Sequence, residues 1–328
     1  RLSVLTGARD LMLHELLARL ETTALDELLL TASISQLPIS GEELCAMSWR
    51  PLSASEADTA LRTLEGLGLV ACIGLDAWVV PRWIAEGLTS RSDVRRRRAR
   101  AARAAGVRNA RADSGGLHES IERSEAARLF ALAQRGEDFV TTALDQFAQL
   151  SAHKQIESFV DFARDIAFLI PEESHVFSRL VDRALAQLLE LEERDAAVAL
   201  CSDLLDRSKT GRNAESSEDF RKLASAHQRL ARARGKESGI PDFEIAIALR
   251  REAVRLDRDL RSLREELALT LLEYGELADD AASIAEAARQ LRELRDLGAL
   301  DSRLFGLSDQ LEAQLHEALG GDPEGDGE

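Results

Sequence analysis

The stretch ISGEELCAMSWRPLSASEADTALRTLEGLGLV, residues 39–70, decides how the first part of this 328-residue chain folds. It contains two capping boxes, Ser40 with Glu43 and Ser53 with Glu56. In such a box the serine oxygen accepts from a free backbone N–H of the first helical turn, while the glutamate reaches back to the serine N–H. Each box therefore predicts the start of a helix. Pro51 separates the two helices, and the glycines near position 67 end the second.

The flanking residues extend this pattern into a small module. Upstream, leucines spaced for one face over residues 25–34 predict another helix. Downstream, two β-prone runs at 69–73 and 78–80 predict a hairpin, and a closing helix is expected over 82–88. Three helices, a hairpin and a closing helix are the elements of a winged helix, which we assign to residues 23–90.

Charge bears on whether this module reads DNA. The third helix of a winged helix enters the major groove. Its polar side chains here are Glu56, Asp58, Arg62 and Glu65, three acids against one arginine. Because DNA affinity depends on cations placed against phosphates, this helix would be repelled. The sequence favours a protein-facing or interdomain role.

The same region resembles a known family. Residues 28–33 (LLLTAS), 38–44 (PISGEEL) and 60–70 (ALRTLEGLGLV) are similar to the winged-helix domain of STAND proteins. These are signal-transduction ATPases with numerous domains, and they include the NACHT and NB-ARC groups. The resemblance implies that a nucleotide-binding domain precedes the module and that a ligand-sensing repeat array follows it. It also implies signalling of an immune or antiphage kind, with oligomerisation through the full-length protein.

Several observations bear on the ends and the setting of the chain. The sequence begins at Arg1, so we expect a fragment or a processed product, in which residues 1–22 end a preceding helical domain. Cys45, Cys72 and Cys201 are too few and scattered for disulfides or zinc, and are expected to be buried apolar residues. No run is apolar enough to cross a bilayer, and no signal peptide is visible. We expect a cytoplasmic protein without a membrane partner.

Arginine is concentrated in one segment of an otherwise acidic chain. The formal net charge is −16, yet residues 91–111 hold nine arginines and one acid, Asp93. With few aromatics for base stacking as well, general nucleic-acid binding is not expected. We predict that residues 91–117 form an Arg-rich linker, solvated or partly disordered, and its arginine-rich first part, set among alanines, is also compatible with a helix that extends the winged helix. The alternative is an electrostatic contact with an acidic neighbour, either a phosphate or the acidic half of this chain.

The second half predicts helical repeats over residues 118–319. Helices are expected at 119–134, 138–150 and 153–170, and alanines then recur at fixed spacing where paired helices should touch. The run REAVRLD (251–257) resembles the tetratricopeptide repeat, a helix–turn–helix unit that stacks into a superhelix. The fold class is thus mainly α, a winged helix followed by an α-solenoid. Residues 235–241 are expected to form a loop, and residues 320–328 a disordered acidic tail.

No pattern in the sequence predicts catalysis. The Gly-x-x-x-x-Gly-Lys-Ser/Thr loop that cradles nucleotide phosphates does not occur, so the family's ATPase chemistry is not expected in this chain. The six histidines have no i, i+4 partner and no cysteine pair nearby, and no Ser/His/Asp or Cys/His set can be assembled. We therefore expect neither an enzyme nor a cofactor or metal site.

The predicted function is a regulatory and sensor segment. The winged helix would act as an interdomain lever, and the groove of the repeats would bind a protein or peptide ligand. The alternative is a winged-helix transcription regulator with a repeat effector domain. The two groove glutamates are expected to be exposed, so that reversing their charge would hardly change the melting temperature. The expected groove residues are Phe220, Leu223, His227, Leu230, Ser262, Glu265, Leu269, Leu272 and Glu273.

Overall fold

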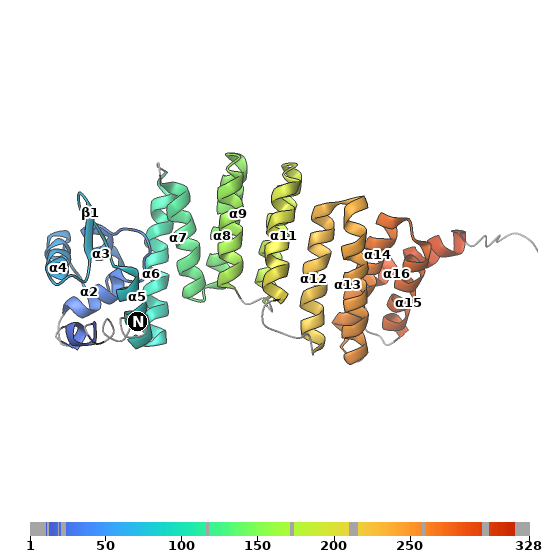
Figure 1. Ribbon diagram of the computed structural model, residues 1–328, viewed down its shortest axis with the longest axis horizontal. Coiled ribbons are helices and arrows are strands. Elements are labelled where there is room, and N and C mark those ends of the chain that lie inside the picture. Colours follow the sequence, from blue (N-terminus) through green and yellow to red (C-terminus); the bar gives the residue numbers. More distant parts are fainter. Residues whose placement is uncertain are drawn as a thin grey trace, which may run out of the picture. The chain divides into compact units, whose positions relative to one another are not determined.

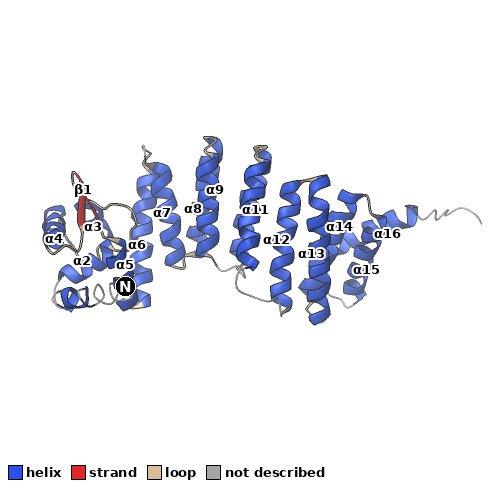
Figure 2. Ribbon diagram, in the orientation of Figure 1, coloured by secondary structure: helices blue, strands red, loops and turns tan. Residues whose placement is uncertain are grey.

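The computed structural model describes most of the chain, namely residues 11, 13–18, 20, 24–115, 118–170, 174–209, 216–257, 260–296 and 302–318. These residues are mainly helical, which confirms the fold class at that level, and the described strands form one two-stranded antiparallel sheet (Figure 2). The chain divides into two compact units, Arg1–Leu180 and Val181–Glu328. The predicted tail at 320–328 lies outside the described residues.

The first unit begins with a small module whose helices start where the capping boxes predict. Ser40 N donates to Glu43 Oε2 at 2.7 Å, and Ser53 N donates to Glu56 Oε2 at 2.8 Å, while each serine Oγ accepts from the glutamate N–H. Both boxes are therefore confirmed. The module consists of α2 (Ala24–Ala32), α3 (Gly41–Met47), α4 (Ala54–Gly66), β1 (Ala71–Gly74), β2 (Ala77–Val79) and α5 (Arg82–Arg91) (Figure 1).

A backbone bridge ties the hairpin to the segment between α2 and α3. Ile39 N donates to Trp78 O at 2.8 Å, and Trp78 N donates to Ile39 O at 2.9 Å. Asp76 adopts a left-handed φ of 56° in the turn of the hairpin. The bridge places Ile39 beside β2, so the Trp78 side chain, only 2% exposed, is directed into the core.

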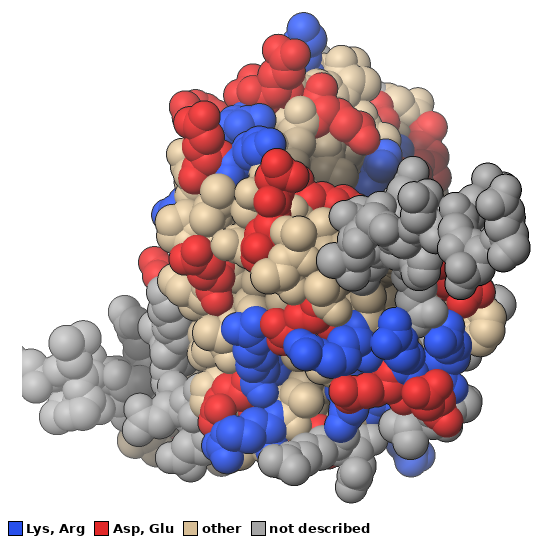
Figure 3. All heavy atoms as spheres, turned by 90° about the vertical axis from the view of Figure 1, so that its right-hand side faces the viewer, with Lys and Arg blue, Asp and Glu red and all other residues tan. Residues whose placement is uncertain are grey.

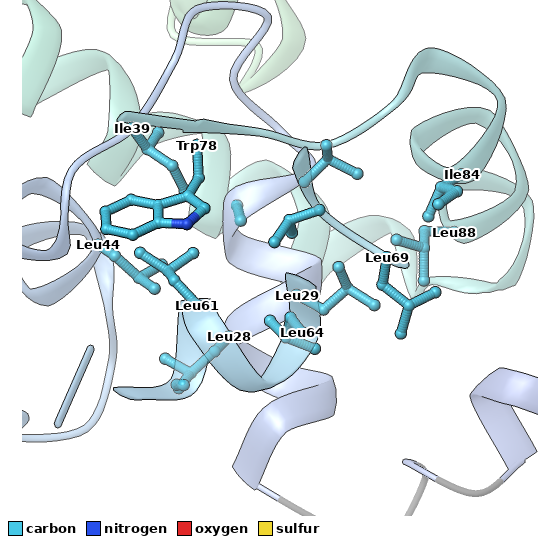
Figure 4. Packing of buried hydrophobic residues seen from close by; sticks show 14 of the residues in the cluster. Leu28, Leu29, Ile39, Leu44, Leu61, Leu64, Leu69, Trp78, Ile84 and Leu88 are labelled. Carbon is cyan, nitrogen blue, oxygen red and sulfur yellow. The ribbon is translucent and has the colours of Figure 1, made fainter. Parts of the chain in front are cut away.

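The core of the module contains leucines from all its helices (Figure 4). Leu29, Leu61 and Leu64 are fully buried in the same cluster as Trp78, and Ile84 of α5 is also buried in this cluster. The predicted separation of residues 1–22 from the module is wrong for the part that is described. The described leucines at positions 13, 17 and 20 pack in this same core. Their spacing puts them on one helical face, and that face covers the module.

The Arg-rich segment is a helix, which is the alternative that the alanines among its arginines left open, and it is not a solvated linker. α6 (Val94–Asp113) is 20 residues long, and its N-cap Asp93 accepts from the backbone N–H of Arg96 at 3.0 Å. The alanines between the arginines explain its order, because they form a buried stripe against Leu129 of the next helix. Small residues let two helices approach closely, and the long arginines extend to either side.

Three further helices follow in the first unit, close to their predicted bounds. They are α7 (Glu119–Leu132), α8 (Gly136–Ala152) and α9 (Ile156–Leu169), and neighbours in sequence pack together. Gln134 and Lys154 take left-handed φ values in the connecting turns. The ring of Phe147 lies 4.8 Å from that of Phe159 and 5.3 Å from that of Phe162. Next, α10 (His175–Glu190) spans the boundary between the units.

The second unit is built from helices that pack consecutively along the chain. Each of α11 to α16 contacts the next, as Figure 1 shows for α12 to α15. Their bounds are α11 (Arg194–Lys209), α12 (Ser217–Arg234), α13 (Lys236–Leu256), α14 (Arg261–Ala278), α15 (Ala281–Asp296) and α16 (Ser302–Ala318).

The loop expected at residues 235–241 does not form. Gly235, with φ of +80°, caps α12, and α13 starts at the next residue with Pro241 inside it. Gly239 does not form a turn, and its lack of a side chain lets α13 pack closely against α12. A Cβ on Gly239 would lie only 2.3 Å from the carbonyl oxygen of Ala231 on α12. Composition alone suggested a loop, but the tight approach of two helices explains these residues.

The recurring alanines are buried, as their spacing predicts, with the exception of Ala281, which is exposed at the start of α15. Ala253 on α13 is 0% exposed and Ala288 on α15 is 1% exposed. We expect Ala253→Leu and Ala288→Leu each to lower the free energy of unfolding by about 1–2 kcal/mol, because a packed core does not accept the added methyl groups. Thermal denaturation measures the effect. Ala248→Leu and Ala285→Leu on exposed positions of the same helices are the controls. Equal melting temperatures for both pairs would contradict the assigned register.

Candidate functional site

A buried arginine joins the small module to the helices that follow it. Arg108 of α6 is 1% exposed. Its Nη1 donates to Glu43 Oε1 at 2.8 Å and to Glu122 Oε2 at 3.1 Å. Its Nη2 donates to Ser35 Oγ at 3.1 Å and to the carbonyl oxygen of Pro38 at 2.7 Å. One guanidinium thus holds α3, α7 and the loop between α2 and α3.

Two neighbouring groups extend this contact. Arg111, half exposed, forms ion pairs with the same two glutamates. On α7, the nearly buried Glu125 accepts from the backbone N–H of Gln36 at 2.7 Å, and Arg128 donates to the carbonyl oxygen of Ile34 at 2.7 Å. We call the set Glu43, Arg108, Arg111 and Glu122 the ionic joint.

The ionic joint resists partial opening. Taking one partner from a buried ion pair leaves the other charge buried without compensation. Therefore α3, α6 and α7 are expected to move as one body. The acidic neighbours of these arginines are Glu43, which lies before the Arg-rich segment, and Glu122, which lies after it. This agrees with the alternative of an electrostatic contact with an acidic neighbour, and Glu122 belongs to the acidic half that follows the segment. Sequence reasoning missed the joint because nothing distinguishes Arg108 from the exposed arginines around it.

The predicted groove on α12 and α14 is open only in part. Leu230 and Leu272 are 3% and 6% exposed, and Leu272 belongs to the core of the unit. His227 is buried, with its Nδ1 3.0 Å from Asp242 Oδ1 on α13. These three side chains do not face an open groove. The prediction is wrong for them because α12 packs against both α11 and α13, while α14, which carries Leu272, packs against both α13 and α15.

The other predicted groove residues remain at least partly accessible. Leu269 is exposed, and Glu265 accepts from Arg261 Nε at 2.9 Å on the surface of α14. The half-buried ones are Phe220, Leu223, Ser262, Glu265 and Glu273. The accessible part is therefore a smaller and more polar surface than the sequence predicted.

Glu273 is engaged within the protein. It accepts from Gln228 Nε2 at 2.7 Å and from Arg232 Nη2 at 2.6 Å, which links α14 to α12. The hydrogen bond to Glu273 raises the pKa of Arg232. Gln228 in turn accepts at 2.9 Å from the buried Arg250 of α13, whose pKa is lowered by burial. This polar layer joins three helices.

A charge reversal at Glu273 is therefore expected to destabilise the fold, contrary to the expectation from sequence. Glu273→Lys removes the acceptor of the buried Gln228 amide and places a cation beside Arg232. Leaving such a group unsatisfied costs about 1–3 kcal/mol, which thermal denaturation would show. Glu265→Lys is the matched control on the same helix and is expected to change stability by less than about 1 kcal/mol. Equal loss in the two variants would contradict the role assigned to Gln228.

The described residues present no metal or membrane feature. Within them, no group of three or more His, Cys, Asp or Glu side chains could hold a metal ion. A helix long and apolar enough to span a bilayer is also not found among them. Burial raises the pKa of Cys201 to about 12, so its thiol stays protonated near neutral pH. Cys72 is exposed and Cys45 half-buried, which corrects the expectation that all three cysteines are buried.

Comparison with known proteins does not place the chain. No family model matches its sequence, and no curated protein matches it. The resemblance to STAND proteins therefore stays a prediction that rests on the residues quoted for it.

Proposed function

We propose that this chain is a non-catalytic regulatory and sensor segment of a STAND-type ATPase. In this proposal residues 23–90 form a winged helix that acts as an interdomain lever, and the later helices are tetratricopeptide-like repeats that bind a protein or peptide. A cytoplasmic location and a role in immune or antiphage signalling belong to the same proposal.

The winged-helix assignment is supported by the order of the elements. Helices α2, α3 and α4 precede the hairpin, and α5 follows it. The isolated bridge from Ile39 to Trp78 joins the segment between the first two helices to that hairpin. The surface of α4 argues against a DNA-reading role, because Glu56 and Glu65 are exposed there beside a single arginine, Arg62.

The repeat assignment is supported by paired helices and by links between alternate helices. Polar side chains join α12 to α14, and Arg251 of α13 donates to Glu286 of α15 at 2.6 Å. Figure 3 shows one face on which Asp and Glu side chains are scattered and Lys and Arg side chains lie below and among them. A surface of mixed sign suits a protein or peptide better than a polyanion.

The observation that carries the lever proposal is the ionic joint. A lever has to transmit displacement without deforming. The buried Arg108 couples α3 to α7 through ion pairs whose separation costs a large free energy. Movement imposed on the small module would therefore reach the first helical hairpin. A loosely tethered module would lose that movement in its linker.

Peptide selection tests the proposed function. Binders selected from a random peptide library on the purified chain would be titrated by calorimetry and mapped by hydrogen exchange. We expect saturable binding with protection on residues 216–296. Failure to obtain any saturable binder, or protection confined to residues 24–115, would contradict the repeat part. A parallel titration with random duplex DNA at low salt is expected to show no tight binding, and tight salt-dependent binding would favour the transcription regulator.

A further inference from the structure

A pocket of about 590 Å³ lies in the first unit, between α2, the segment after α3 and the N-terminal half of α6. Its volume falls in the range of about 300–1,000 Å³ that is usual for small-molecule sites. Apolar groups and arginines share its wall. The lining residues are Ala24, Glu27, Leu28, Thr31, Ser48, Trp49, Arg50, Leu52, Arg95, Arg96, Ala99 and Arg100.

The pocket is strongly cationic in an acidic chain. Four arginines line it against one acid, Glu27, which leaves a formal charge of +3. Arg100 is 3% exposed and forms an ion pair with Glu27, and its buried Nε has no hydrogen-bond partner among the described residues. Arg96 Nη1 lies 3.9 Å from Glu27 Oε1. The side chains of Arg50 and Arg95 are exposed and make no ion pair with any residue that the structure describes.

An indole forms part of the same wall. Trp49 is 59% exposed, which is unusual for so large an apolar side chain. The guanidinium of Arg103 lies over its ring, 5.2 Å from the centroid, and donates to the carbonyl oxygen of Ser48 at 2.6 Å. These contacts hold the ring in place from one side. Leu28 and Leu52 add apolar surface to the pocket.

We propose that this pocket binds a small molecule that carries a phosphate group on an aromatic or apolar body. A phosphate dianion would pair with Arg50 and Arg95, since guanidinium groups bind phosphate oxygens in bidentate geometry. Inorganic phosphate alone would leave most of the volume empty and Trp49 in water. A neutral apolar ligand would leave the arginines without an anion. The site concerns residues outside the repeats, so it does not depend on the proposed sensor function.

Phenyl phosphate is the probe, because it carries a phosphate group on an aromatic ring. Inorganic phosphate and phenol, which each have one of these two groups, are the controls. Calorimetric titration of the full chain at low salt is expected to show phenyl phosphate binding at least tenfold more tightly than either control. Binding should weaken as NaCl is raised, and the melting temperature should rise with phenyl phosphate concentration. Equal affinity for phosphate and phenyl phosphate would overturn the role given to Trp49. No saturable binding of phenyl phosphate would overturn the proposal as a whole.

Variants locate the site. Arg50→Gln combined with Arg95→Gln is expected to weaken phenyl phosphate binding more than tenfold. Both side chains are exposed, so the double variant is expected to keep the melting temperature of the parent. Arg62→Gln combined with Arg98→Gln removes the same charge outside the pocket and should change affinity less than twofold. Similar losses in both double variants would show a general charge effect and contradict the site. Trp49→Leu should bring the affinity for phenyl phosphate close to that for phosphate.

A last titration distinguishes the source of the phosphate. A capped tripeptide with a central phosphotyrosine presents the same aryl phosphate on a peptide. We expect it to bind no more tightly than phenyl phosphate, because the pocket is sized for a small molecule. Binding more than tenfold tighter would overturn the small-molecule assignment and point to a phosphorylated segment.

Discussion

Replacing Arg108 with methionine is expected to lower the free energy of unfolding by about 3–5 kcal/mol, the cost of breaking a buried ion pair from one side. The variant leaves Glu43 and Glu122 buried, both less than a tenth exposed, and the half-exposed Arg111 is then the one cation that pairs with both of them among the described residues. It also removes the donor to the carbonyl oxygen of Pro38. For a unit of this size the melting temperature should fall by about 6–20 °C.

The control and the rescue both follow from the geometry. Arg98→Met lies on the same helix outside the ionic joint and should change stability by about 0.5 kcal/mol or less. Glu122→Gln added to Arg108→Met removes one uncompensated charge, so it should restore part of the loss. If Arg108→Met has the same melting temperature as Arg98→Met, the ionic joint does not hold α3 to α7, and the lever proposal loses its main support.

The second large effect is expected at Gly239, where a single methyl group should destabilise the second unit by about 3 kcal/mol. In Gly239→Ala the new Cβ would have to lie 2.3 Å from the carbonyl oxygen of Ala231, a backbone atom that cannot rotate away. The helices α12 and α13 would be forced apart. Their separation would also strain the contact of His227 with Asp242, which lies on the same pair of helices.

Gly106→Ala is the matched control for this prediction. Gly106 is also inside a helix, α6, but nothing lies within 4 Å of its Cβ position. There the usual preference of helices for alanine applies, and the change should stabilise by up to about 1 kcal/mol. The same glycine-to-alanine substitution is thus expected to lower the free energy of unfolding at Gly239 and to raise it at Gly106, as measured by chemical denaturation. Stabilisation in both variants would show that α12 and α13 do not pack closely at Gly239.

Features that depend on near neighbours in the chain could be predicted from the sequence. The capping boxes at Ser40 and Ser53 form because their partners lie three residues away. The alanine spacing predicts that residues such as Ala253 are buried between helices. With 3.6 residues per turn, residues at this spacing lie on the same face of a helix. The resemblance to STAND proteins added an expected function, which no comparison or contact has tested.

Only the tertiary structure decided which members of a pattern meet across long separations. Arg108 is one of nine arginines in its segment. Its charge is compensated in the buried site by Glu43, which lies 65 residues earlier in the chain, and by Glu122. The groove prediction failed at Leu230 and Leu272 for the same reason, because helical periodicity defines a face but not what covers it. Local sequence determined where the capped helices α3 and α4 start and which side of a helix is apolar. The burial of a charge or a leucine depends on partners whose distance in the chain carries no local signal.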